Sequence, residues 1–189
     1  SVRTARVVAN GDILIHDALY YTAKKEDGSY DFNPFFEYVK PWIEGADLAI
    51  GDFEGTISDR SPLGGYPLFN APVQIADTMK DVGYDVVDLA HNHILDTGLY
   101  GLKYTDKVFK ERGLDTIGVH ADKNRSEDKI LIKEVNGIKI AILAYAYGYN
   151  GMDANLTAED RTNHLSDLDE EKMKEEIQRA ENEADVTVV

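Results

Sequence analysis

The sequence contains no cysteine and few basic residues, and each shortage excludes a class of protein. Without cysteine the chain has no disulfide framework and no thiolate metal site. It has 20 Lys and Arg residues against 35 Asp and Glu residues, which gives a formal net charge of −15 at pH 7. Such a chain repels nucleic acid and anionic lipid, because both are polyanions. We therefore expect no nucleic-acid partner, and an anionic substrate would need a cation to mediate its binding.

Long apolar runs are also missing. The sequence has no run of about 18 apolar residues, the length that spans a bilayer. Its first residues do not form a basic segment followed by an apolar one, which is the pattern of a signal peptide. A chain of 189 residues that is 43% hydrophobic and 29% charged is typical of one globular domain. Because residues 184–189 have the pattern of a further strand, we expect residues 1–189 to be a single, incomplete domain.

The most informative stretch is residues 85–96, Asp-Val-Val-Asp-Leu-Ala-His-Asn-His-Ile-Leu-Asp. Its apolar residues predict a short buried strand, and Asn92, His93 and Asp96 follow that strand directly. In open α/β sheets, ligands bind outside the carboxyl ends of the strands. The pattern therefore predicts that the functional site lies where the strands end.

Two earlier segments have the same pattern of an apolar run, a glycine and a carboxylate. Residues 5–9 run into Asn10-Gly11-Asp12, and residues 47–50 run into Gly51-Asp52-Phe53-Glu54. Asp52 and Glu54 are two residues apart on an extended segment, so they share a face and could approach one cation. Each segment alone could also be a solvated turn. Together the strand ends favour a site for a divalent ion such as Mn²⁺, Fe²⁺, Zn²⁺ or Mg²⁺.

The remaining pattern alternates strands and helices, which predicts the α/β class. Residues 33–45 suggest one helix bent near Pro41, with Phe35, Phe36 and Trp42 in the core. Asn136-Gly137 predicts an antiparallel hairpin beside a mostly parallel sheet. Further helices are expected over residues 73–82, 99–112 and 166–184, a strand over 114–119, and loops over 60–71 and 148–163, the first of which could cover a site.

The three site segments resemble a known family. Gly11-Asp12, residues 51–55 and residues 90–98 are similar to bacterial capsule-synthesis proteins of the CapA (poly-γ-glutamate biosynthesis) type, a family that resembles the calcineurin-like metallophosphoesterases. The resemblance covers nearly the whole chain, and its most specific part is the Asn-His…Asp-x-Gly pattern. It implies an αββα sandwich of metallophosphoesterase type, of which this chain would be the N-terminal part.

Carried onto this sequence, the resemblance implies a set of metal ligands and an acid. The ligands would be Asp12, Asp52 or Glu54, and Asn92, while His93, positioned by Asp96, would protonate a leaving oxygen. Two departures weaken this assignment. Metallophosphoesterases carry a histidine two residues after the first aspartate, where this chain has Leu14, and His16 has the wrong spacing to replace it. Their later histidines come from a C-terminal half beyond Val189.

The resemblance also implies a role and a location. It implies a protein of poly-γ-glutamate capsule production on the extracellular face of the cell membrane, with its anchor outside this sequence. Its site would hydrolyse a phosphate ester or the γ-linked polymer, and its partners would be the capsule-synthesis membrane proteins and the anionic polymer. The alternative is a non-catalytic accessory or export subunit, which Leu14 favours. A third alternative is an α/β domain whose polar strand ends are only capped turns.

Overall fold

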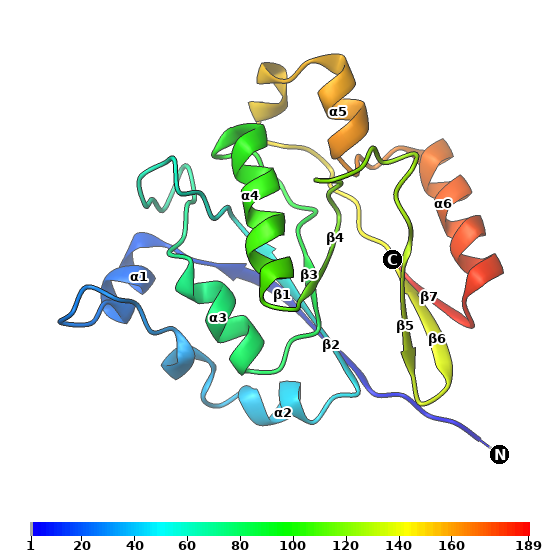
Figure 1. The fold of residues 1–189 in the computed structure, drawn as a ribbon, viewed down its shortest axis with the longest axis horizontal. Coiled ribbons are helices and arrows are strands. Elements are labelled where there is room, and N and C mark those ends of the chain that lie inside the picture. The colour runs from blue at the N-terminus through cyan, green and yellow to red at the C-terminus, as the bar shows by residue number, and fades with distance from the viewer. Residues whose placement is uncertain (1) are drawn as a thin grey trace.

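The computed structural model describes residues 2–189, whose strands form two sheets (Figure 1). The first sheet is parallel, in the order β1-β2-β3-β4. In the second, β5 is antiparallel to β6, and β7 is parallel to β6. The strands of the first sheet are β1 (Val7–Leu14), β2 (Leu48–Glu54), β3 (Val86–Asp88) and β4 (Asp115–Ile117). Those of the second are β5 (Leu131–Val135), β6 (Ile138–Ile142) and β7 (Val186–Val188).

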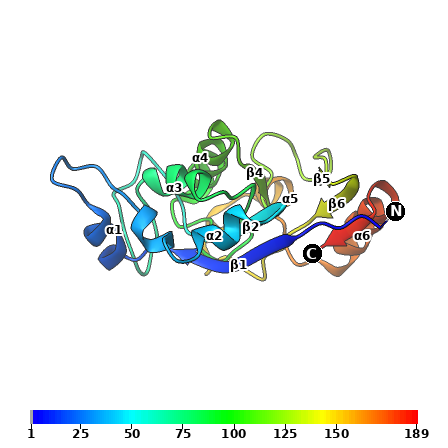
Figure 2. The same ribbon diagram turned by 90° about the horizontal axis from the view of Figure 1, so that it is seen from below.

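The two faces of the first sheet are covered by different layers. Helices α3 (Gln74–Asp81) and α4 (Gly98–Glu111) lie on one side of β1 and β2 (Figure 2). Ala49 and Phe53 of β2 face this side, and the Phe53 ring contacts Phe109 of α4 edge-on at a centroid distance of 5.2 Å. Leu48 and Ile50 face the opposite way, toward the second sheet. This alternation lets one strand contribute to two cores.

The second sheet completes a four-layer sandwich. A buried apolar cluster joins the two sheets and contains Leu48, Ile50, Val86, Ile117, Ile140 and Ile142. On the outer face of the second sheet, helix α6 (Glu170–Glu183) packs against β6 and β7. The order of layers is helix, sheet, sheet, helix. The predicted α/β fold of metallophosphoesterase type is confirmed, but the hairpin belongs to a second sheet instead of extending the parallel one.

A β-bulge in β1 sets which side chains face the second sheet. Asn10 pairs with Gly51 and Asp12 with Asp52, so Gly11 is an extra residue in β1. Asn10 lies on the helix side, where its side chain accepts a hydrogen bond from the Tyr84 hydroxyl. Beyond the bulge, Ile13 is on the helix side and Asp12 on the other. The alternative interpretation of Asn10-Gly11-Asp12 as only a solvated turn is therefore wrong, because the strand continues through it to Leu14.

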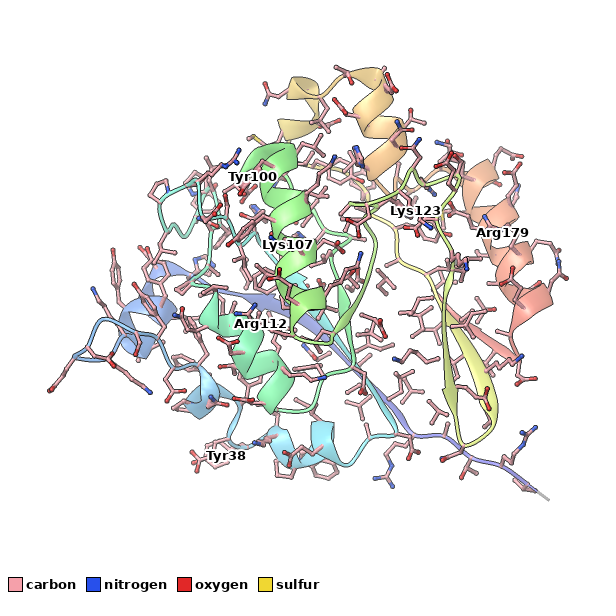
Figure 3. All side chains as sticks on the ribbon, viewed as in Figure 1. Tyr38, Tyr100, Lys107, Arg112, Lys123 and Arg179 are labelled. Atoms are coloured by element: carbon pink, nitrogen blue, oxygen red, sulfur yellow. The ribbon has the colours of Figure 1, made fainter. Side chains whose placement is uncertain are left out.

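The segment expected as one bent helix is two short helices. They are the 3₁₀ helix η1 (Asn33–Phe36) and α2 (Lys40–Glu44), and Pro41 stands in the first turn of α2. Proline begins a helix here because its fixed φ suits the first turn and its missing N–H needs no partner there. Phe35 and Trp42 are 44% and 74% exposed, so the prediction that they belong to the core is wrong. Phe36 does pack against the core, whereas Tyr38 extends into solvent (Figure 3).

Some of the remaining helices and strands confirm the predictions, and others were missed. Helices α3, α4 and α6 and the hairpin lie where periodicity and the Asn-Gly turn predicted them. The predicted loop over residues 148–163 instead contains the 3₁₀ helix η2 (Met152–Asn155) and α5 (Ala158–His164). Helix α1 (Asp17–Ala23) was not predicted. Within residues 2–189, no helix combines the length and apolarity needed to cross a bilayer.

Candidate functional site

Four carboxylates gather on the face of the first sheet that looks toward the second sheet. The strand register places Asp12 beside Asp52 and Asp52 beside Asp88, and Glu54 lies two residues farther along β2. The carboxyl group of Asp12 is close enough to those of Asp52 and Glu54 to contribute to the rise in the pKa of both. Asp88 was not among the predicted ligands. Its place in the register, at the same level as Asp52 on the next strand, is the signal that could have identified it.

The mutual repulsion of these carboxylates is visible in their pKa values. Burial, followed by the charges of Asp88, Asp12 and Glu54, raises the pKa of Asp52 to about 8. Burial raises the pKa of Asp88 to about 6, although its Oδ1 accepts a 2.8 Å hydrogen bond from the Ala90 amide. Burial and then Asp12 also raise the pKa of Glu54. Oδ1 of Asp52 is buried without a hydrogen-bond partner. A bound cation would relieve this repulsion and supply that partner.

His93 and Asp96 form a hydrogen-bonded pair next to the carboxylates. Nδ1 of His93 lies 2.8 Å from Oδ2 of Asp96, and Nε2 of His93 lies 3.9 Å from Oε1 of Glu54. Oδ2 of Asp96 also accepts a 2.6 Å hydrogen bond from the Phe69 amide, which fixes the carboxylate in place. Because Asp96 holds the proton on Nδ1, the Nε2 atom is directed toward the acidic cluster.

The neighbouring residues His91 and Asn92 occupy different environments. His91 is buried, with its ring nitrogens 3.3 Å from the Gly55 amide nitrogen and 3.1 Å from that of His93. Burial lowers the pKa of His91 to about 3, so the ring is neutral and links the end of β2 to the loop after β3. Asn92 is exposed, and its amide donates a 3.3 Å hydrogen bond to Oδ1 of Asn150.

Two cavities adjoin these side chains. A cavity of about 700 Å³ is lined by Asp12, Glu54, Asn92 and the segment over residues 145–151. A smaller one of about 330 Å³ is lined in part by His93 and Asp96, and Asn92 and Asn150 line both. The predicted residues Asp12, Glu54 and Asn92 thus meet at one cavity. Asp52, the partner of Asp12 on the neighbouring strand, does not line it. The contribution of Asn150 was missed, since no local pattern distinguishes this asparagine.

The side chains gathered here are of the types that bind divalent cations. Within residues 2–189, no group of three or more His, Asp or Glu side chains is arranged so that it could hold a metal ion. The carboxylates nevertheless have raised pKa values, and one oxygen of Asp52 has no hydrogen-bond partner. Carboxylate and amide oxygens are the ligands that hard divalent cations prefer, so these residues fit an ion in type, and side chains would have to reorient to enclose it.

The departure at Leu14 from the pattern of the resembling family remains in the structure. Leu14 pairs in register with Glu54, so the position where metallophosphoesterases carry a histidine offers no ligand. His16 lies beyond Phe69, whose ring contacts both His16 and His93 edge-on at 4.8 and 4.7 Å. His16 therefore does not replace the missing histidine.

Comparison with known proteins shows where this chain belongs. A family model described as "Bacterial capsule synthesis protein PGA_cap" matches residues 6–189. The PGA biosynthesis protein CapA of Bacillus subtilis (strain 168) is 26% identical over 160 residues, which are 82% of this chain and 40% of that protein. The capsule biosynthesis protein CapA of Bacillus anthracis is 30% identical over 122 residues, or 61% of this chain and 29% of that protein.

A third relative is an uncharacterized protein of Sinorhizobium fredii, 24% identical over 153 residues, which are 77% of this chain and 31% of that protein. The matched part of this chain thus spans less than half the length of each of these relatives. Because the family model covers nearly all of the sequence, the chain belongs to the bacterial capsule synthesis protein PGA_cap family.

Proposed function

We propose that this protein is a divalent-metal-dependent hydrolase of phosphoesterase type that serves the production of a capsule polymer. The observation that carries the proposal is the meeting of the uncompensated carboxylates with the His93–Asp96 pair, whose Nε2 faces Glu54 at 3.9 Å. The capsule role is supported by two relatives named for capsule or PGA biosynthesis. We place the protein at the extracellular face of the membrane, among capsule-synthesis membrane proteins and poly-γ-glutamate.

Each residue of the site has a distinct role in this proposal. Asp12, Asp52 or Glu54, and Asn92 would hold the metal ion, which when bound supplies an activated water and stabilises charge on a phosphoryl group. His93 protonates the oxygen of the leaving group from Nε2. Asp96 keeps the ring in the required tautomer and stabilises the imidazolium. The Phe69 amide holds Asp96 in position through its hydrogen bond.

A second function is favoured by one specific observation. Leu14 stands where the catalytic relatives of this fold carry a metal-ligating histidine. A site that has lost one ligand would bind metal weakly, and the protein would then act as a non-catalytic accessory or export subunit of the capsule machinery.

Metal content and hydrolysis separate the two functions. The full-length protein would be purified, its Mn²⁺ occupancy measured by mass spectrometry, and its turnover of bis(4-nitrophenyl) phosphate followed. Replacing His93→Asn should lower kcat by about 10²- to 10⁴-fold while leaving occupancy unchanged, because an acid is lost and not a ligand. Replacing Asn92→Ala should lower occupancy by about tenfold or more. Asn155→Ala, at an exposed position of η2, is the matched control.

One combination of results would contradict the proposed hydrolase activity. If the wild type binds Mn²⁺ no better than Asn92→Ala, and if His93→Asn leaves turnover unchanged, the accessory role is the better description.

A further inference from the structure

The smaller cavity, beside His93, has one acidic residue in its lining, whereas the larger cavity has three. Its apolar lining comes from Tyr66, Pro67, Leu68 and Met152, and its polar lining from Asn92, His93, Asp96 and Asn150. No Lys or Arg from the described residues 2–189 lines it. Tyr66 and Leu68 are 78% and 47% exposed. Exposed apolar side chains grouped at a polar cavity are characteristic of a surface that contacts a ligand.

The loop that carries Tyr66 and Leu68 is held firmly at its base. The buried Asn70 side chain donates hydrogen bonds to the carbonyls of Ser58, Ser61 and Pro62 at 3.0–3.1 Å. Its Oδ1 accepts a 2.7 Å hydrogen bond from the Ser58 amide. Next to it, the Phe69 amide is bonded to Asp96. The apolar tip is therefore presented to the cavity by a rigid base that is hydrogen-bonded to the acid–base pair.

The charge around the cavity selects against an anionic occupant. Asp96 lines the smaller cavity, and Asp12, Glu54 and Asp153 line the larger one. The hydrogen-bonded pair Asn92–Asn150 contributes to both and marks the boundary between them. A carboxylate placed in the smaller cavity would find no Lys or Arg among the described residues that line it, and the positive charge of protonated His93 is already paired with Asp96.

We propose that the smaller cavity binds an uncharged, apolar leaving group of the substrate, such as an aryl or alkyl alcohol in ester linkage to phosphate. This inference rests on the proposed function, since only a hydrolase has a leaving group. The oxygen of a water molecule forms the new bond to phosphorus and releases one proton to solvent, while the bond from phosphorus to the ester oxygen breaks. That oxygen takes the proton of protonated His93 and departs as a neutral alcohol, and His93 then regains a proton from solvent. A glutamyl residue of poly-γ-glutamate carries a carboxylate and does not fit this cavity.

The kinetic test compares two methyl phosphodiesters on the full-length protein with Mn²⁺. One has phenol as its leaving group and the other has 3-hydroxybenzoate. We expect kcat/KM to be at least about fivefold higher for phenol, the effect of one repulsive charge at close range in water. Leu68→Lys should remove this preference. Leu63→Lys, which changes a 39% exposed leucine of the same loop outside the cavity, should retain it.

A binding test gives a readout independent of turnover. Benzyl alcohol and benzoate would be titrated separately into the full-length protein treated with EDTA, and the methyl signals of Leu68 and Met152 followed by NMR. Benzyl alcohol should shift these signals with a Kd at least about fivefold lower than that of benzoate. In Leu68→Lys, followed by the methyl signal of Met152 alone, the difference in Kd should disappear, and in Leu63→Lys it should remain.

The two tests fail in different ways. Equal or tighter binding of benzoate, or an unchanged preference in Leu68→Lys, overturns the apolar subsite even if the protein hydrolyses phosphodiesters. Selective binding of benzyl alcohol without any hydrolysis overturns the leaving-group role together with the proposed function.

Discussion

Replacing Asp52→Asn should stabilise the metal-free protein, although the residue is a predicted metal ligand. Its carboxyl group is crowded by Asp12, Glu54 and Asp88, and its Oδ1 has no hydrogen-bond partner. Asparagine keeps the shape of the side chain and removes the charge. The substitution therefore eliminates the cost of burying a charge and the repulsion by the neighbouring acids, both of which oppose folding in the absence of a cation.

The size and pH range of the effect follow from the raised pKa. The folded state raises the pKa of Asp52 from 3.8 to about 8, so it favours the protonated carboxyl. The stability from this preference is fully present below about pH 4 and is lost as the pH rises through about 8. If the whole rise in the pKa of Asp52 is converted to free energy, it corresponds to about 6 kcal/mol. Because the neighbouring acids share this repulsion, we expect Asp52→Asn to recover about 2 kcal/mol at pH 8.

Thermal unfolding followed by circular dichroism in EDTA measures this difference. For a chain of this size, about 2 kcal/mol corresponds to an increase in Tm of about 4–8 °C at pH 8. The increase should vanish at pH 4. Asp81→Asn, at the exposed end of α3, removes the same charge outside the cluster and should leave Tm nearly unchanged. Adding Mn²⁺ should then raise the Tm of the wild type more than that of Asp52→Asn.

The reasoning is refuted if Asp52→Asn is no more stable than the wild type at pH 8 in EDTA. A gain of the same size at pH 4 would also refute it, because the protonated carboxyl carries no charge to remove.

Two further predictions concern buried polar groups outside the acidic cluster. Asn70→Ala removes a buried side chain that makes four hydrogen bonds within its loop, so it should lower the free energy of unfolding by about 2–4 kcal/mol in urea titrations, whereas Asn155→Ala should not. Glu176→Gln breaks the two-bond ion pair with the buried Arg125, at 2.8 and 2.9 Å, and should cost roughly 3–5 kcal/mol in the same assay. A free energy of unfolding within about 0.5 kcal/mol of the wild-type value would contradict either prediction.

Local patterns predicted the elements whose formation depends on local chemistry. Asn136 and Gly137 both adopt positive φ, at 51° and 74°, which is the backbone that the hairpin turn requires. Helix α3 buries residues at helical spacing, as its sequence indicated. Trp42 was wrongly placed in the core, because an aromatic residue at helical spacing does not reveal whether another residue packs on it. The hairpin was expected at the side of the parallel sheet for the same reason, since an Asn-Gly turn does not specify the neighbours of its strands, and the second sheet was implied only by the family resemblance.

The sequence pattern at the strand ends predicted part of the site. Parallel strands deliver their carboxyl ends to one edge, which is why Asp12, Glu54 and Asn92 meet although 80 residues separate the first from the last. Asn150 contacts Asn92 across 58 residues of sequence, and nothing local specifies this contact. Asp88 was overlooked because its role depends on strand register, which a single sequence does not fix.

The extra residue at Gly11 decides which side of the sheet receives Asp12. If Gly11 were paired in a regular register instead, it would lie opposite Asp52, Asp12 opposite Phe53 and Ile13 opposite Glu54. Asp12 would then point toward the helices, and Ile13 would point toward the carboxylates. Deleting Gly11 would not cause this exchange, because Asn10 and Asp12 would become neighbours and keep their present partners. A slip of the strand register at this point would therefore remove the acid from the site even though every amino acid is retained.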